Sequence, residues 1–449
     1  MSKQRIQLSD HFTYPRLLRF VLPCIGTMLF TSIYGIVDGL CVSNFVGKTA
    51  FAAVNLIMPL PMLLGTIGFM LGTGGSAIVG ITLGEGDQKK ADRYFTLFLL
   101  AALISVSVLA VLGIVFLRPI AALLGAKGEL LDYAVRYGRI LMVSLPTFAL
   151  QNMFQSFFVT AEKPHLGFWF TVGAGCTNMV LDVLMVGIWG WGVEGAAIAT
   201  FISQLVGGVL PVFYFIDRSN SSRLHLCKTS FYSKVLRDAC INGSSELMTN
   251  LSMSLVNILY NYQLLRLAGE NGVAAYGVIM YAAFLFVAVF VGYAVGSAPI
   301  VSFHYGARNH AEVHNLYRKS LRLIALVAVT LTLASMFIIP CVARIFVGYD
   351  AELLALTSRA FRLYALSFLI MGFNVYASSF FTALGDGVTS ALISFLRTLA
   401  FQVIAILLLP LLLGIDGIWL AVTAAELAAL AVSAAMLLTK DKVFHYRKA

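Results

Sequence analysis

The feature that most constrains this chain is a series of apolar segments, each about 20 residues long or longer, separated by short polar connections. A segment of that length crosses the hydrocarbon core of a bilayer as an α-helix. The chain is 59% hydrophobic and only 12% charged, whereas soluble globular domains carry roughly 25% charged residues. The sequence therefore predicts an all-α integral membrane protein and excludes an ordinary soluble domain.

Twelve such segments can be counted, and the connections between them are rich in glycine, proline and acidic residues, as at 84–87 and 385–387. The predicted transmembrane helices are 17–42, 51–82, 94–117, 137–160, 166–187, 193–216, 236–266, 273–302, 321–341, 360–383, 388–413 and 417–438. An even number of spans places both ends of the chain on the same side of the membrane.

Lysine and arginine are concentrated in the connections on the side of the N-terminus, while the opposite connections hold few, such as Lys48 and Lys127. Loops rich in these residues remain in the cytoplasm. We therefore expect a multi-pass protein of the bacterial cytoplasmic (inner) membrane with both termini in the cytoplasm. The six cysteines are scattered without metal-ligand spacing, so neither a disulfide framework nor a zinc site is expected.

The chain repeats itself at an offset of 222 residues. Gly74 corresponds to Gly296, Gly84 corresponds to Gly306, and the same offset relates 192–195 to 414–417. One match between apolar segments is weak evidence, but a constant offset at distant places indicates a duplication. Each half holds six spans, so the halves have the same orientation in the membrane.

Two parallel six-helix lobes around a central cavity are typical of transporters, in which rocking of the lobes exposes the cavity alternately to each side. The longest polar connection marks the boundary between the lobes. The predicted division is an N-terminal lobe at 1–216, a cytoplasmic linker at 217–235, a C-terminal lobe at 236–438 and a cytoplasmic tail at 439–449.

Four polar residues lie inside spans of the N-terminal lobe at similar predicted depth: Asp38, Asn178, Asp182 and Thr200. Asn178 and Asp182 share one helix face because they are four residues apart. Two carboxylates, an amide and a hydroxyl form an oxygen-only set that suits a hard cation, and neighbouring carboxylates also share a proton readily. The alternative is that the carboxylates lie at wetted helix ends and the other two form interhelical hydrogen bonds.

The C-terminal lobe lacks this set, since Tyr260 stands at the position that corresponds to Asp38. It has a different polar stripe on the span at 236–266, formed by Glu246, Asn250, Asn257 and Asn261. This stripe is interpreted either as a substrate or second proton site, or as a set of interior hydrogen bonds.

Two further features of the spans have structural interpretations. Arg397 and Glu426 lie about nine residues from opposite ends of antiparallel neighbouring spans, so we expect a buried ion pair between them. Pro23 interrupts the hydrogen bonding of the first span and indicates either a static kink or a hinge. It lies 15 residues before Asp38 on the same span.

Several segments together resemble the MATE (multidrug and toxic compound extrusion) family over nearly the whole chain. They are Pro23 with 36–39, 84–87, 178–182, 192–200, 272–277 and 305–307. The resemblance implies antiport of organic cations and other amphiphiles against Na⁺ or H⁺. It also implies a cation-site role for Asp38, Asn178, Asp182 and Thr200, and a bending role for Pro23.

Two other functions are less consistent with the sequence. A flippase of lipid-linked precursors would need cavity cations to hold a pyrophosphate, and mid-span cations are few, Arg397 being the main one. A membrane-embedded enzyme would need a catalytic cluster, but all seven histidines lie in tails, loops or helix ends. We therefore expect a monomeric exporter that is not an enzyme. Its expected partners are small amphiphilic substrates and membrane lipids, without nucleic acid, cofactor or metal other than the coupling ion, H⁺ or Na⁺.

Overall fold

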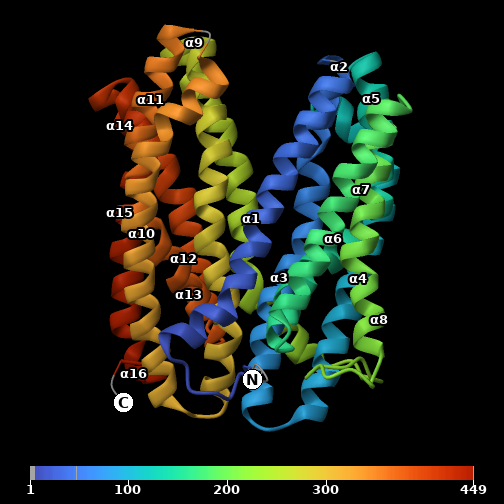
Figure 1. The fold of residues 1–449 in the computed structure, drawn as a ribbon, viewed down its shortest axis with the longest axis vertical. Coiled ribbons are helices and arrows are strands. Elements are labelled where there is room, and N and C mark those ends of the chain that lie inside the picture. Colours follow the sequence, from blue (N-terminus) through green and yellow to red (C-terminus); the bar gives the residue numbers. More distant parts are fainter. Residues whose placement is uncertain (1–5, 47, 349, 448–449) are drawn as a thin grey trace.

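Helices make up nearly all of the chain, as required where backbone polar groups have no water to bond within a bilayer. The structure is a computed structural model that describes residues 6–46, 48–348 and 350–447. The helices form two lobes that lie side by side (Figure 1).

The N-terminal lobe contains α1 (Tyr14–Phe45), α2 (Lys48–Ile57), α3 (Pro59–Gly84), α4 (Gln88–Leu123), α5 (Glu129–Thr160), α6 (Pro164–Asp182), the π-helix η1 (Val183–Ile188), α7 (Gly192–Gly208) and α8 (Leu210–Ile216). The C-terminal lobe contains α9 (Ser233–Gly306), α10 (His310–Val347), α11 (Ala351–Ala365), α12 (Phe368–Ala383), α13 (Gly387–Phe395), the π-helix η2 (Leu396–Ala400), α14 (Phe401–Leu413), α15 (Ile415–Thr439) and α16 (Asp441–Phe444).

These helices account for the twelve predicted spans. Within the described chain, nine helices or helix runs are long and apolar enough to cross a membrane, and the bent pair α11 and α12 adds a tenth. Helix α9 counts once among the nine, but its 74 residues are interrupted by non-helical backbone at Gly269, so it forms two spans. Helix α5 is the twelfth; Gln151, Asn152 and Gln155 lower its mean hydropathy.

Several helix boundaries differ from the bounds of the predicted spans. The predicted span 51–82 is divided at Met58, because Pro59 cannot continue the hydrogen bonding of α2. Helices α10 and α11 begin at His310 and Ala351, well before the predicted starts at 321 and 360. Hydropathy locates the part of a helix that lies in lipid, whereas the helix itself continues into water.

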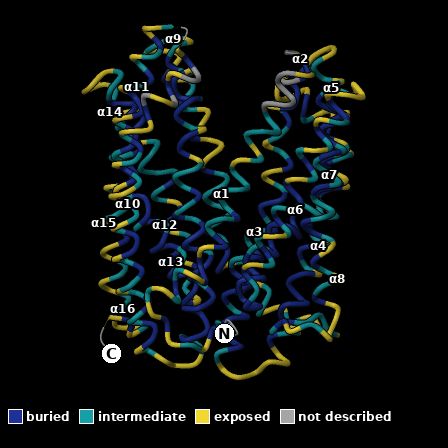
Figure 2. Tube along the Cα trace, viewed as in Figure 1, coloured by how far each residue is buried: buried dark blue, intermediate teal, exposed yellow. Residues whose placement is uncertain are grey.

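The two lobes meet through α1, α3 and α9. In Figure 1 they are joined toward the end that holds both termini and diverge toward the end that holds α2. Figure 2 shows that the segments near this junction are mostly buried. This arrangement is a V whose closed end lies on the side of the chain termini.

The segment that follows the last helix of each lobe folds back against that lobe. In the linker, Leu224 is fully buried, and the Leu226 N–H donates to the Phe215 carbonyl at 2.8 Å. In the tail, Tyr446 is fully buried, and its hydroxyl donates to the Leu437 carbonyl at 2.7 Å. Leu224 and Tyr446 are 222 residues apart, so the repeat extends into both segments.

Candidate cation site

The structure brings three of the four predicted N-terminal-lobe residues together. The carboxyl group of Asp38 on α1 faces the carboxyl group of Asp182 and the side-chain amide of Asn178, both on α6. Asp182 is fully buried and Asn178 is 1% exposed. The four-residue spacing on α6 places both side chains on the face that packs against α1.

Four oxygens of this cluster lack donors among the residues that the structure describes. They are Asp38 Oδ1, Asn178 Oδ1 and both carboxylate oxygens of Asp182, and all four are buried. Buried oxygens without partners are strongly disfavoured, because burial removes the water that would otherwise solvate them. The cluster therefore has the composition of a site for a proton or a small hard cation.

Asp182 is the last residue of α6 and is followed directly by the π-helix η1. A π-helical turn holds one more residue than an α-helical turn and thereby changes the direction of the side chains beyond it. Such turns occur frequently at functional sites. Nothing in the composition of the segment predicted this irregularity.

Thr200 is the predicted residue that the structure does not join to the cluster. It lies on α7, which packs against α6, and its backbone carbonyl accepts a hydrogen bond from Ser203 Oγ at 2.8 Å. Among the described residues its hydroxyl makes no hydrogen bond to Asp38, Asn178 or Asp182.

Three residues near the cluster were missed by the sequence analysis. Tyr34 and Tyr137 both lie within electrostatic range of Asp38, and the Tyr34 hydroxyl contacts the side chain of Gln151. Tyr34 could have been found, since it lies one turn before Asp38. Gln151 was also recognisable as a polar residue within an apolar span.

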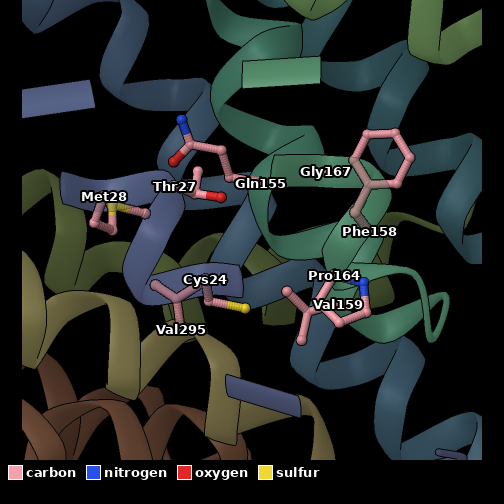
Figure 3. A pocket seen from close by; sticks show the side chains of 9 residues that line it. All are labelled: Cys24, Thr27, Met28, Gln155, Phe158, Val159, Pro164, Gly167 and Val295. Carbon is pink, nitrogen blue, oxygen red and sulfur yellow. The ribbon is translucent and has the colours of Figure 1, made fainter. Parts of the chain in front are cut away.

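Helix α1 continues without interruption through Pro23, and Thr27 Oγ1 donates to the Pro23 carbonyl at 2.9 Å. A small pocket lies directly beside this turn (Figure 3). Its lining includes Cys24 and Thr27 of α1, Phe158 of α5 and Val295 of α9. The turn at Pro23 therefore borders a cavity of about 10 Å³, which holds about one water, and the helix shows no break there.

In the part of the chain that the structure describes, the polar stripe on the first part of α9 makes its side-chain hydrogen bonds within that helix. Asn250 Nδ2 donates to the carbonyl of Glu246 at 2.9 Å, and Asn261 Nδ2 donates to Asn257 Oδ1 at 3.4 Å, both within the same helix. Asn257 is exposed, and the other three are partly buried. Glu246 also lies within electrostatic range of Arg397.

Arg397 and Glu426 form a buried ion pair, with Arg397 Nε 2.8 Å from Glu426 Oε1. Asn374 Nδ2 donates to Glu426 Oε2 at 2.7 Å, and Ser433 Oγ donates to Asn374 Oδ1 at 2.9 Å. Glu426 is fully buried. The network links α12, η2 and α15, which supports its interpretation as a structural element of the C-terminal lobe.

Comparison with known proteins identifies the family. The model of the family MatE matches this chain twice, at residues 23–184 and at residues 247–408. The chain belongs to the MatE family. One match falls in each lobe, which confirms the internal repeat of this MatE protein.

Two curated relatives of this MatE chain are similar over almost their full length. The multidrug export protein MepA of Staphylococcus saprophyticus is 21% identical over 433 residues, which cover 95% of this chain and 94% of that protein. MepA of Staphylococcus aureus strain MSSA476 is 21% identical over 440 residues, covering 96% and 95% of the two chains.

Solved structures share the fold. A MATE family transporter of the MOP superfamily in an outward-facing conformation matches with a TM-score of 0.92 at 23% identity, over 100% of both chains. A MOP superfamily transporter from Pyrococcus furiosus, whose binding pocket of reverse polarity suggests a different function, matches with a TM-score of 0.90 at 22% identity, also over 100% of both chains. This chain therefore has the two-lobe fold of these transporters.

Proposed function

We propose that this MatE protein is a secondary active multidrug exporter that exchanges organic cations or amphiphilic compounds for H⁺ or Na⁺. The curated relatives named as multidrug export proteins support the export of drugs. The observation that carries the ion coupling is a group of four buried oxygens, from Asp38, Asn178 and Asp182, that have no donor among the described residues.

The chemistry of this group favours the uptake of one positive charge. Two carboxylates in contact resist simultaneous ionisation, so a proton shared between them or a Na⁺ held by all three side chains relieves their repulsion. The amide oxygen of Asn178 adds a neutral ligand. In this proposal the cation and the drug bind to different conformations, and coupling of about 1–3 kcal/mol between them suffices for exchange.

Helix α1 connects the cation cluster to the junction between the lobes. Asp38 lies in the outer half of α1. Near Pro23, α1 packs closely on α9: a Cβ added at Gly292 of α9 would lie 2.5 Å from Ile25 Cα. We propose that ion binding at Asp38 changes the packing of α1 around Pro23.

In the proposed orientation the basic loops, both termini and the closed end of the V face the cytoplasm, in the bacterial inner membrane. The conformation described above is then open to the outside and suited to drug release. Glu246 would act as a counter-ion for a cationic drug or as a second proton site. Arg397 is engaged by Glu426, which disfavours the alternative of binding a lipid-linked pyrophosphate.

The experiment that tests this function is ethidium efflux from cells or inverted vesicles, with the Na⁺ and H⁺ gradients collapsed separately. Gradient-dependent efflux that is lost in Asp38→Asn would support the exchange and identify the ion. The matched control is Asp132→Asn, which removes an exposed carboxylate that pairs with Arg118 at 3.4 Å. Absence of efflux under every gradient would contradict the proposal and make the flippase the next function to test.

A further inference from the structure

The segment before α1, residues 6–13, crosses the cytoplasmic junction between the lobes; it is called the cytoplasmic strap below. It is not helical, yet Leu8 and Phe12 are both fully buried. Burying an irregular segment requires partners for its backbone polar groups. Two acidic side chains, one from each lobe, accept backbone N–H groups of this segment.

The anchor in the N-terminal lobe is Glu162, between α5 and α6. Its Oε1 accepts the backbone N–H of Leu8 at 2.9 Å and also contacts Arg223 NH1 at 2.5 Å. Glu162 is only 7% exposed and adopts a positive φ of 60°. The position therefore holds a buried carboxylate in a strained backbone conformation, directed at the strap.

The anchor in the C-terminal lobe is Glu312, in the first turn of α10. Its Oε1 accepts the backbone N–H of Phe12 at 2.8 Å, and its Oε2 lies 2.6 Å from His11 Nδ1. The Phe12 carbonyl accepts hydrogen bonds from Asn315 at 3.1 Å and from Lys319 at 2.6 Å. This anchor is the stronger of the two.

The length of the strap limits how far the anchors can separate. Leu8 and Phe12 are four residues apart, so the chain between them spans at most about 14 Å when fully extended. Any opening of the cytoplasmic side that moves Glu162 and Glu312 beyond that reach must break one anchor. The bond between Leu8 and Glu162 is the one expected to break, because Glu162 holds the strap by a single backbone hydrogen bond.

We propose that the cytoplasmic strap is a latch that closes the cytoplasmic side, and that release of Leu8 from Glu162 is a step of each transport cycle. This inference rests on the proposed alternating-access function. The latch sets the balance between the conformation closed to the cytoplasm and the one open to it, because its bonds exist only while the lobes are together at the cytoplasmic end.

The test uses the full-length protein in lipid nanodiscs, with its native cysteines replaced and spin labels at Lys89 and Arg318. These exposed positions lie near the cytoplasmic ends of α4 and α10, one in each lobe. Leu8→Pro removes the N–H that Glu162 accepts, whereas the control Leu8→Val keeps both the N–H and an apolar side chain. The measured quantity is the fraction of molecules in which the two labels are far apart. We expect Leu8→Pro to raise this long-distance population about fivefold, the order expected for one lost hydrogen bond.

A second variant excludes simple misfolding as the cause. Glu162→Ala removes the acceptor, so it should increase the same population, and the double variant with Leu8→Pro should show no further increase. Equal distance distributions in Leu8→Pro and Leu8→Val, or additive effects in the double variant, would overturn the latch. A wild-type protein with a single distance under every ion condition would overturn both the latch and the exporter mechanism.

Transport provides an independent readout. Cysteines at positions 8 and 162, joined by a reducible cross-linker, should abolish ethidium efflux until a reductant is added. Efflux at the unmodified rate in the cross-linked protein would contradict the latch while leaving the exporter function intact.

Discussion

Gly84 at the end of α3 and Gly306 at the end of α9 pack against each other's helices at positions that the internal repeat also relates. A Cβ at Gly84 would lie 2.0 Å from the Phe303 carbonyl oxygen, and a Cβ at Gly306 would lie 2.1 Å from the Ile81 carbonyl oxygen. Ile81 and Phe303 are 222 residues apart, as are the two glycines. The lobes thus meet in a pseudo-two-fold contact that uses the same surface twice.

Gly84→Ala is expected to weaken this contact, because a methyl group cannot fit against backbone atoms at that distance. Overpacking of this kind costs about 1–3 kcal/mol, and in this protein it should also separate the lobes at the end that holds the chain termini. The control is Gly277→Ala, where nothing lies within 4 Å of the added carbon. Melting temperatures in detergent measure the effect, and equal values for the two variants would contradict the close packing.

Loss of one partner of the Arg397–Glu426 pair is expected to be worse than loss of both. Arg397→Met leaves a fully buried carboxylate with only Asn374 as its side-chain donor, which should destabilise the protein by about 3–5 kcal/mol. Arg397→Met combined with Glu426→Gln removes both charges and should recover much of that loss. Thermal unfolding of the two variants measures the difference, and a double variant less stable than the single one would refute the assignment.

Asp182→Asn is expected to abolish gradient-driven ethidium efflux while leaving the protein folded. The substitution removes the charge that balances the coupling cation but retains the size of the side chain. Efflux and the melting temperature should be measured on the same preparations, since a folded but inactive variant distinguishes coupling from stability. Efflux equal to that of Asp132→Asn would show that Asp182 does not couple the ion.

Glu312 is expected to contribute stability that depends on pH. Burial alone would raise its pKa, but hydrogen bonds from Phe12, His11 and Asn315 outweigh burial and lower the pKa below its ordinary value of 4.5. Its stabilising contribution is therefore present above pH 4.5 and is lost as the pH falls through the lowered pKa.

The measurement compares wild type with Glu312→Gln across this pH range. The wild type should be more stable by about 1–3 kcal/mol at pH 7, and the difference should decrease in acid below pH 4.5. Glu129→Gln, at the exposed start of α5, serves as the control. A difference that is the same at pH 7 and pH 3.5 would contradict the role of the ionised carboxylate.

Much of the fold could be predicted because a bilayer restricts the backbone structures that can cross it. The length of an apolar segment decides whether it spans, and the count of twelve followed from that alone. Turn residues located several connections correctly: Gly86 has a φ of +87° and Asp87 caps the next helix through the N–H of Lys90. The break at Gly269 falls in the predicted connection between the spans 236–266 and 273–302. Hydropathy is insensitive to backbone angles, so it did not show that the span 51–82 divides at Met58.

The candidate site could be predicted only in part. The spacing of Asn178 and Asp182 determined that they share a helix face. Counting residues from the helix ends predicted that Asp38 lies at the same depth in the membrane as these two. Depth does not determine the rotation of a helix about its axis, so it does not decide whether the Thr200 hydroxyl reaches the other three side chains. The proximity of Tyr34, Tyr137 and Gln151 depends on that rotation too.

By itself the sequence determined that the chain lies in a membrane and that it is a duplication, and it predicted that Asp38 and Asp182 lie at similar depth in the N-terminal half. Those properties follow from composition and from spacing along single helices. Only the tertiary structure decided that the oxygens around Asp182 lack donors, that Gly84 and Gly306 form the junction, and that residues 6–13 tie the lobes together. Each depends on contacts between segments far apart in the chain, which arise from helix rotation and packing rather than from local preference.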